Sequence, residues 1–129
     1  MPIEIKVLGF AALLQFAQFL LMATLVNLQL GPAYTGGNRD EERRATGMAG
    51  RMKRALENHF EGLILFTIAV VVVVLGDASS AFTEKCAWVY LIGRILYVPA
   101  YASGVFLVRS LIWSVSFAAT LAMLWSAVL

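Results

Sequence analysis

The amino-acid sequence predicts an all-α integral membrane protein, a bundle of four transmembrane helices. Of its 129 residues, 60% are hydrophobic, and its mean hydropathy of +0.80 is well above that of a soluble domain. The apolar residues gather in four segments. Each segment is near or above the roughly 20 residues that a helix needs to cross a bilayer. A chain of this length forms a single domain.

The four helices are expected at about residues 3–30, 54–76, 81–107 and 109–129, with a loop over residues 31–53. The second reaches spanning length only if it begins near Arg54. Its run of five valines would favour a strand in water. Inside a bilayer, however, the backbone must pair its polar groups within the segment, so we expect a helix. Gly76 is a suitable end for this helix, and Ser80 a suitable cap for the next.

Loop charges predict the orientation. The segment between the second and third helices, counted as residues 77–85, contains a single basic residue, Lys85, whereas the first loop is rich in basic residues. These are Arg39, Arg43, Arg44, Arg51 and Lys53. The positive-inside rule therefore places the first loop in the cytoplasm and both termini on the opposite side. The apolar run after "MPIEIK" is longer than a signal-peptide core, so the first helix should be retained. A net charge of +2 without a basic run argues against a nucleic-acid partner.

Arg94 is the most unusual residue of the third segment. A charged residue at the centre of a membrane helix costs about 2.5–3.5 kcal/mol, so it normally faces the bundle interior with a partner. Tyr97 and Tyr101 follow at i+3 and i+7, on the same helix face. Gly93 permits close helix approach, and Pro99 should kink the helix or leave a carbonyl unpaired.

The second helix begins with a polar face formed by Arg54, Asn58 and Glu61. This face meets either water or something polar inside the membrane. Glu61 or Glu57 could form a structural ion pair with Arg94. Arg54 could instead extend to the membrane edge, Asn58 could bond a neighbouring helix, and the two tyrosines could be core or interfacial aromatics. The roles of five further residues stay open: Gln15, Gln18, Asn27, Gln29 and His59, the last of which points away from this face and is interpreted as interfacial or structural.

Taken together, these polar residues and Arg109 and Ser110 fall on the cytoplasmic halves of the last three helices, with basic groups in excess. This combination suits a small anionic or zwitterionic ligand that enters from the cytoplasm. Arg109, at the start of a helix, adds its charge to the helix dipole and would hold a thiol as thiolate. No His/Cys metal cluster and no phosphate loop is present, and the single histidine provides no serine–histidine–acid arrangement.

Two motifs resemble a known family. "RALENHFE", Arg54–Glu61, is similar to the Arg-Ala-x-x-Asn-x-x-Glu signature of the MAPEG family, the membrane-associated proteins in eicosanoid and glutathione metabolism. "GRILYVPAYASGVFLVRSLIW", Gly93–Trp113, is similar to the motif that joins the third and fourth helices of that family. The order of spans along the whole chain fits the same family.

The resemblance implies a homotrimer of four-helix protomers, with glutathione as co-substrate bound between neighbouring subunits. Six residues correspond to positions that contact glutathione in family enzymes: Arg54, Asn58, Glu61, Arg94, Tyr97 and Tyr101. Arg109 corresponds to the arginine that stabilises the glutathione thiolate, with Ser110 beside it. The resemblance implies no metal.

Some positions depart from the family pattern. Glu57 stands where some eicosanoid-forming members have an arginine, Tyr97 where some have a histidine, and Trp113 where some have a tyrosine. The sequence therefore looks like a general member of bacterial type, located in the inner membrane. The function implied is a glutathione-dependent transferase or peroxidase that acts on lipophilic electrophiles. The alternatives are a non-catalytic protein of the same fold that binds a lipid or a partner, and a small transporter or channel.

Overall fold

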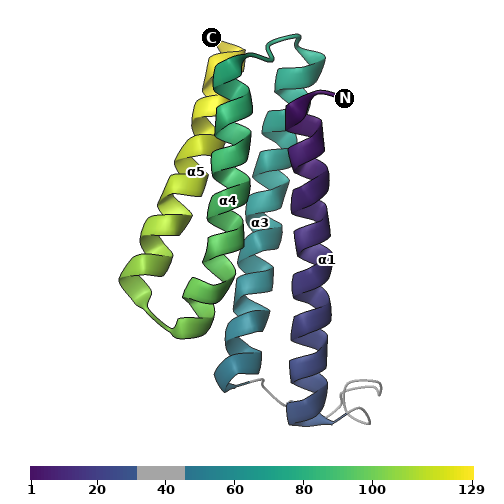
Figure 1. Cartoon of the computed structure of the whole chain (residues 1–129), viewed down its shortest axis with the longest axis vertical. Coiled ribbons are helices and arrows are strands. Elements are labelled where there is room, and N and C mark those ends of the chain that lie inside the picture. The colour runs from purple at the N-terminus through teal and green to yellow at the C-terminus, as the bar shows by residue number, and fades with distance from the viewer. Residues whose placement is uncertain (32–45) are drawn as a thin grey trace.

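A computed structural model describes residues 1–31 and 46–129. These form four helices, labelled as in Figure 1: α1 (Ile3–Leu30), α3 (Gly47–Leu75), α4 (Ala81–Ser103) and α5 (Phe106–Val128). The helices run alternately up and down, so both termini lie at one end of the bundle, and the end of α1 and the start of α3 lie at the other (Figure 1). No strand occurs in the described ranges, and the valine run is helical, as predicted.

Three of the helices, α1, α3 and α5, are long and apolar enough to cross a membrane. Helix α4 is also 23 residues long. It carries Glu84, Lys85 and Arg94, which lower its hydropathy. Sequence and structure therefore agree on a helical membrane protein, while the spanning role of α4 stays a prediction.

Two helix boundaries differ from those expected. Helix α3 begins at Gly47 rather than near Arg54, so Arg51 and Lys53 lie on a helix and not in a loop. The other charged loop positions, Arg39, Arg43 and Arg44, lie outside the described residues. Helices α4 and α5 meet in a turn at Gly104 (φ 77°), earlier than the break expected at residue 108. Arg51 Nη1 donates to the Ala102 carbonyl (3.1 Å), so the turn rests on α3.

Polar contacts fix the end of the bundle where α3 turns into α4. Ser80 and Thr83 form the capping box of α4, which confirms the predicted cap, and Gly76 ends α3 as expected. The buried Glu4 carboxylate accepts hydrogen bonds from Ser79 and Thr83 at 2.6 and 2.7 Å, which joins α1 to the α3–α4 turn. These contacts hold the helices at fixed heights relative to one another.

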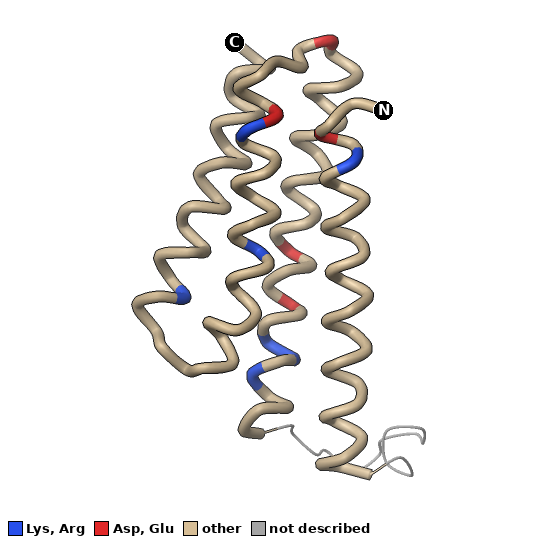
Figure 2. The backbone as a smooth tube through the Cα atoms, in the orientation of Figure 1, with Lys and Arg blue, Asp and Glu red and all other residues tan. Residues whose placement is uncertain are grey.

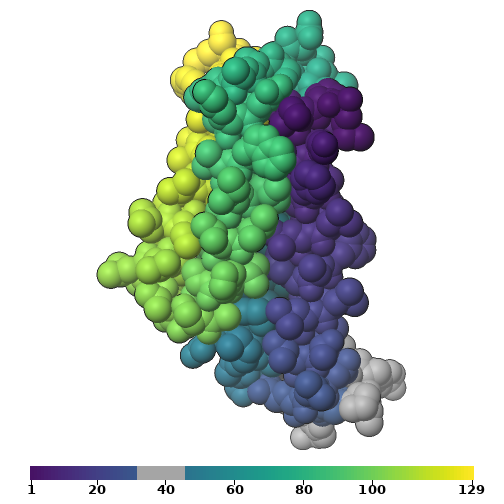
Figure 3. Space-filling model, in the orientation of Figure 1, coloured from purple at the N-terminus to yellow at the C-terminus, as the bar shows by residue number. Residues whose placement is uncertain are grey.

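The core lies between α3 and its neighbours in two clusters. The larger contains the stacked rings of Phe66 and Tyr90, whose centroids are 4.0 Å apart. The smaller, near the start of α3, contains Met52, Ala55 and Tyr97. Many large apolar side chains on the outer faces are exposed, as expected for helices that face lipid or another subunit. From the side shown in Figure 3, α1, α4 and α5 cover α3 except near its ends.

Candidate functional site

Arg94 lies at the centre of the bundle and is only 2% exposed. Its Nη1 donates to Asn58 Oδ1 (2.9 Å) and its Nε to His59 Nδ1 (3.4 Å). Its guanidinium also lies over the Tyr97 ring, 4.4 Å from the centroid. The hypothesis of an ion pair between Arg94 and Glu61 or Glu57 is therefore wrong for this chain. Helix α3 offers Arg94 two neutral acceptors, while Glu57 and Glu61 are exposed on its surface.

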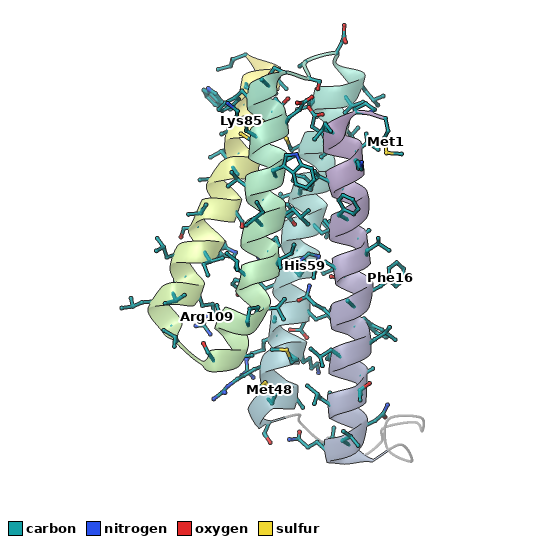
Figure 4. All side chains as sticks on the ribbon, in the orientation of Figure 1. Met1, Phe16, Met48, His59, Lys85 and Arg109 are labelled. Atoms are coloured by element: carbon teal, nitrogen blue, oxygen red, sulfur yellow. The ribbon has the colours of Figure 1, made fainter. Side chains whose placement is uncertain are left out.

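His59 connects Arg94 to α1. It is fully buried, and its Nε2 lies 3.1 Å from the carbonyl oxygen of Ala11. Arginine can only donate, so His59 Nδ1 must accept and Nε2 must carry the proton that is donated to Ala11. Figure 4 shows His59 between α3 and α1. This geometry makes His59 a neutral tautomer held at both ring nitrogens.

Two further arginines, Arg54 and Arg109, contact Tyr101. Arg54 Nε donates to the Tyr101 hydroxyl (3.1 Å), and the Arg109 guanidinium lies 4.6 Å from the Tyr101 ring centroid. Tyr97 packs edge-on against Tyr101 at 5.6 Å. Figure 2 shows the basic positions near the starts of α3 and α5 in the same half of the bundle. Because an aromatic face contacts Arg109 without using its N–H groups, these groups can bind an anion.

A small polar pocket forms where these residues meet. It has a volume of about 170 Å³ and is lined by Asn58, Tyr97, Arg109, Ser110 and Trp113. Arg109 is in the first turn of α5, which begins at Phe106. The helix dipole therefore adds to the arginine charge at this pocket.

A mainly apolar groove of about 140 Å³ lies next to the polar pocket, between α3, α4 and α5. Trp113 lines both, so the two cavities adjoin at this side chain. Four residues with polar side-chain groups also line the groove: Tyr90, Arg94, Ser116 and Thr120. The polar pocket therefore lies beside a mainly apolar groove, and Arg94 lines the groove while it bonds Asn58 of the pocket.

The family follows from a comparison of the whole chain. A model of the MAPEG family matches residues 7–129. The chain belongs to the MAPEG family. Nothing among curated proteins or solved structures matches it. Membership places it among the membrane proteins of glutathione and eicosanoid metabolism and confirms the predicted family.

The structure of this MAPEG protein brings most of the predicted site residues together. Arg54, Arg94 and Tyr101 contact residues of the polar pocket or one another, although they do not line it. Glu61 is the exception, since it is exposed on the surface of α3 and has no ion pair within the described ranges. In the same ranges, no three His, Cys, Asp or Glu side chains could hold a metal ion.

Sequence reasoning did not single out two residues of the groove. For His59 the two alternatives were interfacial and structural, and its burial against Arg94 and α1 agrees with the structural one. Tyr90 and Gly62 line the groove. Tyr90 lies at i−4 from Arg94, and Gly62 follows the signature motif directly, so helical spacing could have indicated both.

Proposed function

We propose that this MAPEG protein is a glutathione-dependent transferase or peroxidase that acts on lipophilic electrophiles dissolved in the membrane. The observation that carries this proposal is the polar pocket. It combines a cation at a helix N-terminus, Arg109, with the hydroxyl of Ser110 and the amide of Asn58. It opens beside an apolar groove, so a water-soluble thiol and a lipid-soluble acceptor can meet.

Arg109 and Ser110 would act on the thiol. The thiol proton leaves to solvent, and the arginine charge and helix dipole stabilise the thiolate. Its sulfur then attacks the electrophilic carbon of the acceptor, a C–S bond forms, and the leaving group departs with the bond electrons. With a peroxide, the thiolate sulfur attacks the terminal oxygen, the O–O bond breaks, and the alkoxide leaves and takes up a proton to give the alcohol. The glutathione sulfenic acid that remains condenses with a second glutathione to give the disulfide and water.

The remaining residues would position the peptide. Asn58 and Tyr97 line the polar pocket. Arg54 and Tyr101 are hydrogen-bonded at its edge, and Arg94 holds Asn58 from behind. Glu61 is exposed on α3, where it is available to the glutathione amino group or to a neighbouring protomer.

The proposal includes the assembly and its place in the cell. We infer a homotrimer with glutathione between neighbouring subunits, and α4 as the fourth span. The apolar outer faces of the helices support a lipid or subunit environment. The basic residues Arg51, Lys53 and Arg54 near the start of α3 support a cytoplasmic α1–α3 connection and termini on the opposite side. A bacterial inner membrane fits this arrangement.

The test compares Arg109→Ala with Lys85→Ala, which removes a charge from the opposite end of the bundle (Figure 4). Glutathione affinity is measured by calorimetry, thiolate by its ultraviolet absorbance, and conjugation with chlorodinitrobenzene. We expect Arg109→Ala to lose thiolate absorbance and conjugation rate by about 100-fold or more, and affinity far less. Lys85→Ala should behave as wild type. Equal loss of affinity and rate in Arg109→Ala, or loss of neither, would exclude the role of Arg109.

One observation favours a second candidate, a non-catalytic membrane protein of the same fold that binds a lipid or a partner. Arg94 and Arg54 already have hydrogen-bond partners within the protomer, Asn58 and Tyr101. Such a protein should gain no thermal stability from glutathione. Saturable stabilisation by glutathione in the folded oligomer would count against this candidate.

A further inference from the structure

Apolar side chains occupy the turn between α4 and α5, where a turn that faces water would carry polar ones. Val105, Phe106 and Leu107 follow one another and are 48%, 62% and 77% exposed. Three consecutive exposed apolar residues are unfavourable in water unless something covers them. Figure 1 shows that this turn extends less far along the bundle than the ends of α1 and α3. The turn therefore lies nearer the middle of the membrane than those two ends, at a depth where lipid can cover it.

A fixed cation lies against the same turn. Arg51, in the second turn of α3, donates from Nη1 to the Ala102 carbonyl (3.1 Å), in the last turn of α4, where the helix itself leaves carbonyls without a partner. Gly104 has no side chain to cover the guanidinium, since a Cβ atom there would lie 3.5 Å from both Arg51 Cζ and Arg51 Nη2. Arg51 is only partly buried. The turn thus holds the guanidinium in place and leaves part of it accessible.

The charge of Arg51 is not balanced within the described residues, none of whose carboxylates forms an ion pair with it. Its bond to Ala102 uses one of the five N–H groups of a guanidinium, so Nη2 and Nε remain available to an acceptor. A guanidinium binds phosphate and carboxylate oxygens in pairs, through two N–H groups at once. An anionic oxygen group is therefore the acceptor that fits this cation.

A phospholipid presents an anionic oxygen group and apolar chains together. Basic residues beside transmembrane helices attract anionic headgroups at the membrane surface. Val105–Leu107 directly follows Gly104, against which the guanidinium lies, so contacts to a headgroup and to its chains are adjacent here. Glutathione and inorganic phosphate have the charge but no chain, so neither would cover the apolar turn. Of these ligands, a phospholipid alone satisfies both features of the surface.

We propose that Arg51 and the apolar turn Val105–Leu107 bind an anionic phospholipid of the surrounding leaflet. The headgroup phosphate accepts hydrogen bonds from Arg51 Nη2 and Nε, and the upper part of the acyl chains lies against Phe106 and Leu107. The bound lipid covers the turn and stabilises the junction of α3 with α4 and α5. This binding requires neither glutathione nor the transferase reaction.

The test measures binding of dioctanoyl phosphatidylglycerol to the purified oligomer in non-ionic detergent by calorimetry. Dioctanoyl phosphatidylcholine lacks the net charge, and glycerol phosphate lacks the chains. We expect saturable binding of phosphatidylglycerol and at least about fivefold weaker binding of either control probe. Saturating glutathione should leave phosphatidylglycerol binding unchanged. Competition by glutathione would overturn the proposal, because Arg51 would then belong to the glutathione site.

Two matched charge variants test the cation. Arg51→Gln should weaken phosphatidylglycerol binding about fivefold or more, to the level of phosphatidylcholine, and leave phosphatidylcholine binding unchanged. Lys53→Gln loses the same charge from the same helix, but about 200° around it from Arg51, and should bind as wild type. Equal binding of the two lipids, unchanged binding in Arg51→Gln, or an equal loss in Lys53→Gln would overturn the proposal.

A third variant tests the apolar turn and does not disturb the core. Leu107 is 77% exposed, so Leu107→Ser removes little packing within the protomer. We expect this variant to keep the wild-type unfolding temperature in detergent alone and to weaken binding of both lipids about threefold or more. Unchanged lipid binding in Leu107→Ser would refute the chain contact. Dissociation of the oligomer by the same substitution would show that the turn is a subunit contact and would overturn the lipid site.

Discussion

The seam between α4 and α5 should be sensitive to one methyl group. At Gly93, an added Cβ would overlap Ser116 Oγ, while the next atoms, Ser116 Cβ and the Ile112 carbonyl oxygen, would lie at 3.5 and 3.8 Å. Only the hydroxyl is in the way. Gly93→Ala should therefore destabilise the protein, and Ser116→Ala in the same chain should relieve the overlap.

The magnitudes follow from the same contacts. Overpacking by one methyl costs about 1–3 kcal/mol, partly offset by up to about 1 kcal/mol from the better helix propensity of alanine. Ser116→Ala alone loses only a long hydrogen bond to the Tyr90 carbonyl (3.5 Å), which contributes about 0.5 kcal/mol or less. The double variant should recover most of the loss, a favourable coupling energy of about 1–3 kcal/mol.

The seam also sets the separation of Arg94 on α4 and Arg109 on α5, so conjugation should follow stability. The assays are denaturant unfolding in mixed micelles for the four chains of the double-mutant cycle, and chlorodinitrobenzene conjugation for each. We expect Gly93→Ala to lose activity and the double variant to regain it, because small displacements of positioned groups strongly slow reactions. Additive effects in the cycle, or a double variant less stable than Gly93→Ala, would refute the packing argument.

Two further predictions concern the site. His59→Asn should keep glutathione affinity, because the asparagine oxygen can replace Nδ1 as acceptor for Arg94. His59→Gln, which mimics Nε2 instead, should weaken affinity about tenfold or more by calorimetry, since a hydrogen bond to a charged group contributes about 1.5–3 kcal/mol. Tyr101→Phe should lose only the Arg54 hydrogen bond and change kcat less than threefold (roughly), whereas Tyr101→Leu, which also loses the cation–π contact with Arg109, should lower kcat by about tenfold.

Each pair contains its own control. The two His59 variants exchange the Arg94 contact for the Ala11 contact, and the two Tyr101 variants differ in the presence of the aromatic ring. Equal affinity of the two His59 variants would show that the Arg94 contact does not position the site. Equal steady-state kcat values of the Tyr101 variants would show that the ring does not hold Arg109.

The sequence by itself determined the helices and much of the site. Apolar segments separated by turn residues predicted an all-helical membrane protein, and the caps at Ser80 and Gly76 could be read directly. The spacing of Asn58, Tyr97 and Arg109 with Ser110 predicted residues that the fold brings to one pocket. These features depend on local periodicity and hydropathy, which the chain carries at each position.

The tertiary structure alone decided which groups pair. Arg94 could have bonded Glu61, and the rotation of α3 against α4 gave it Asn58 and His59 instead. The groove, with its unpaired Tyr90 hydroxyl, exists only because Gly62 and the residues of α5 meet at one height. The physical reason is that helix rotation and depth are set by packing among segments distant in sequence, which no single helix encodes.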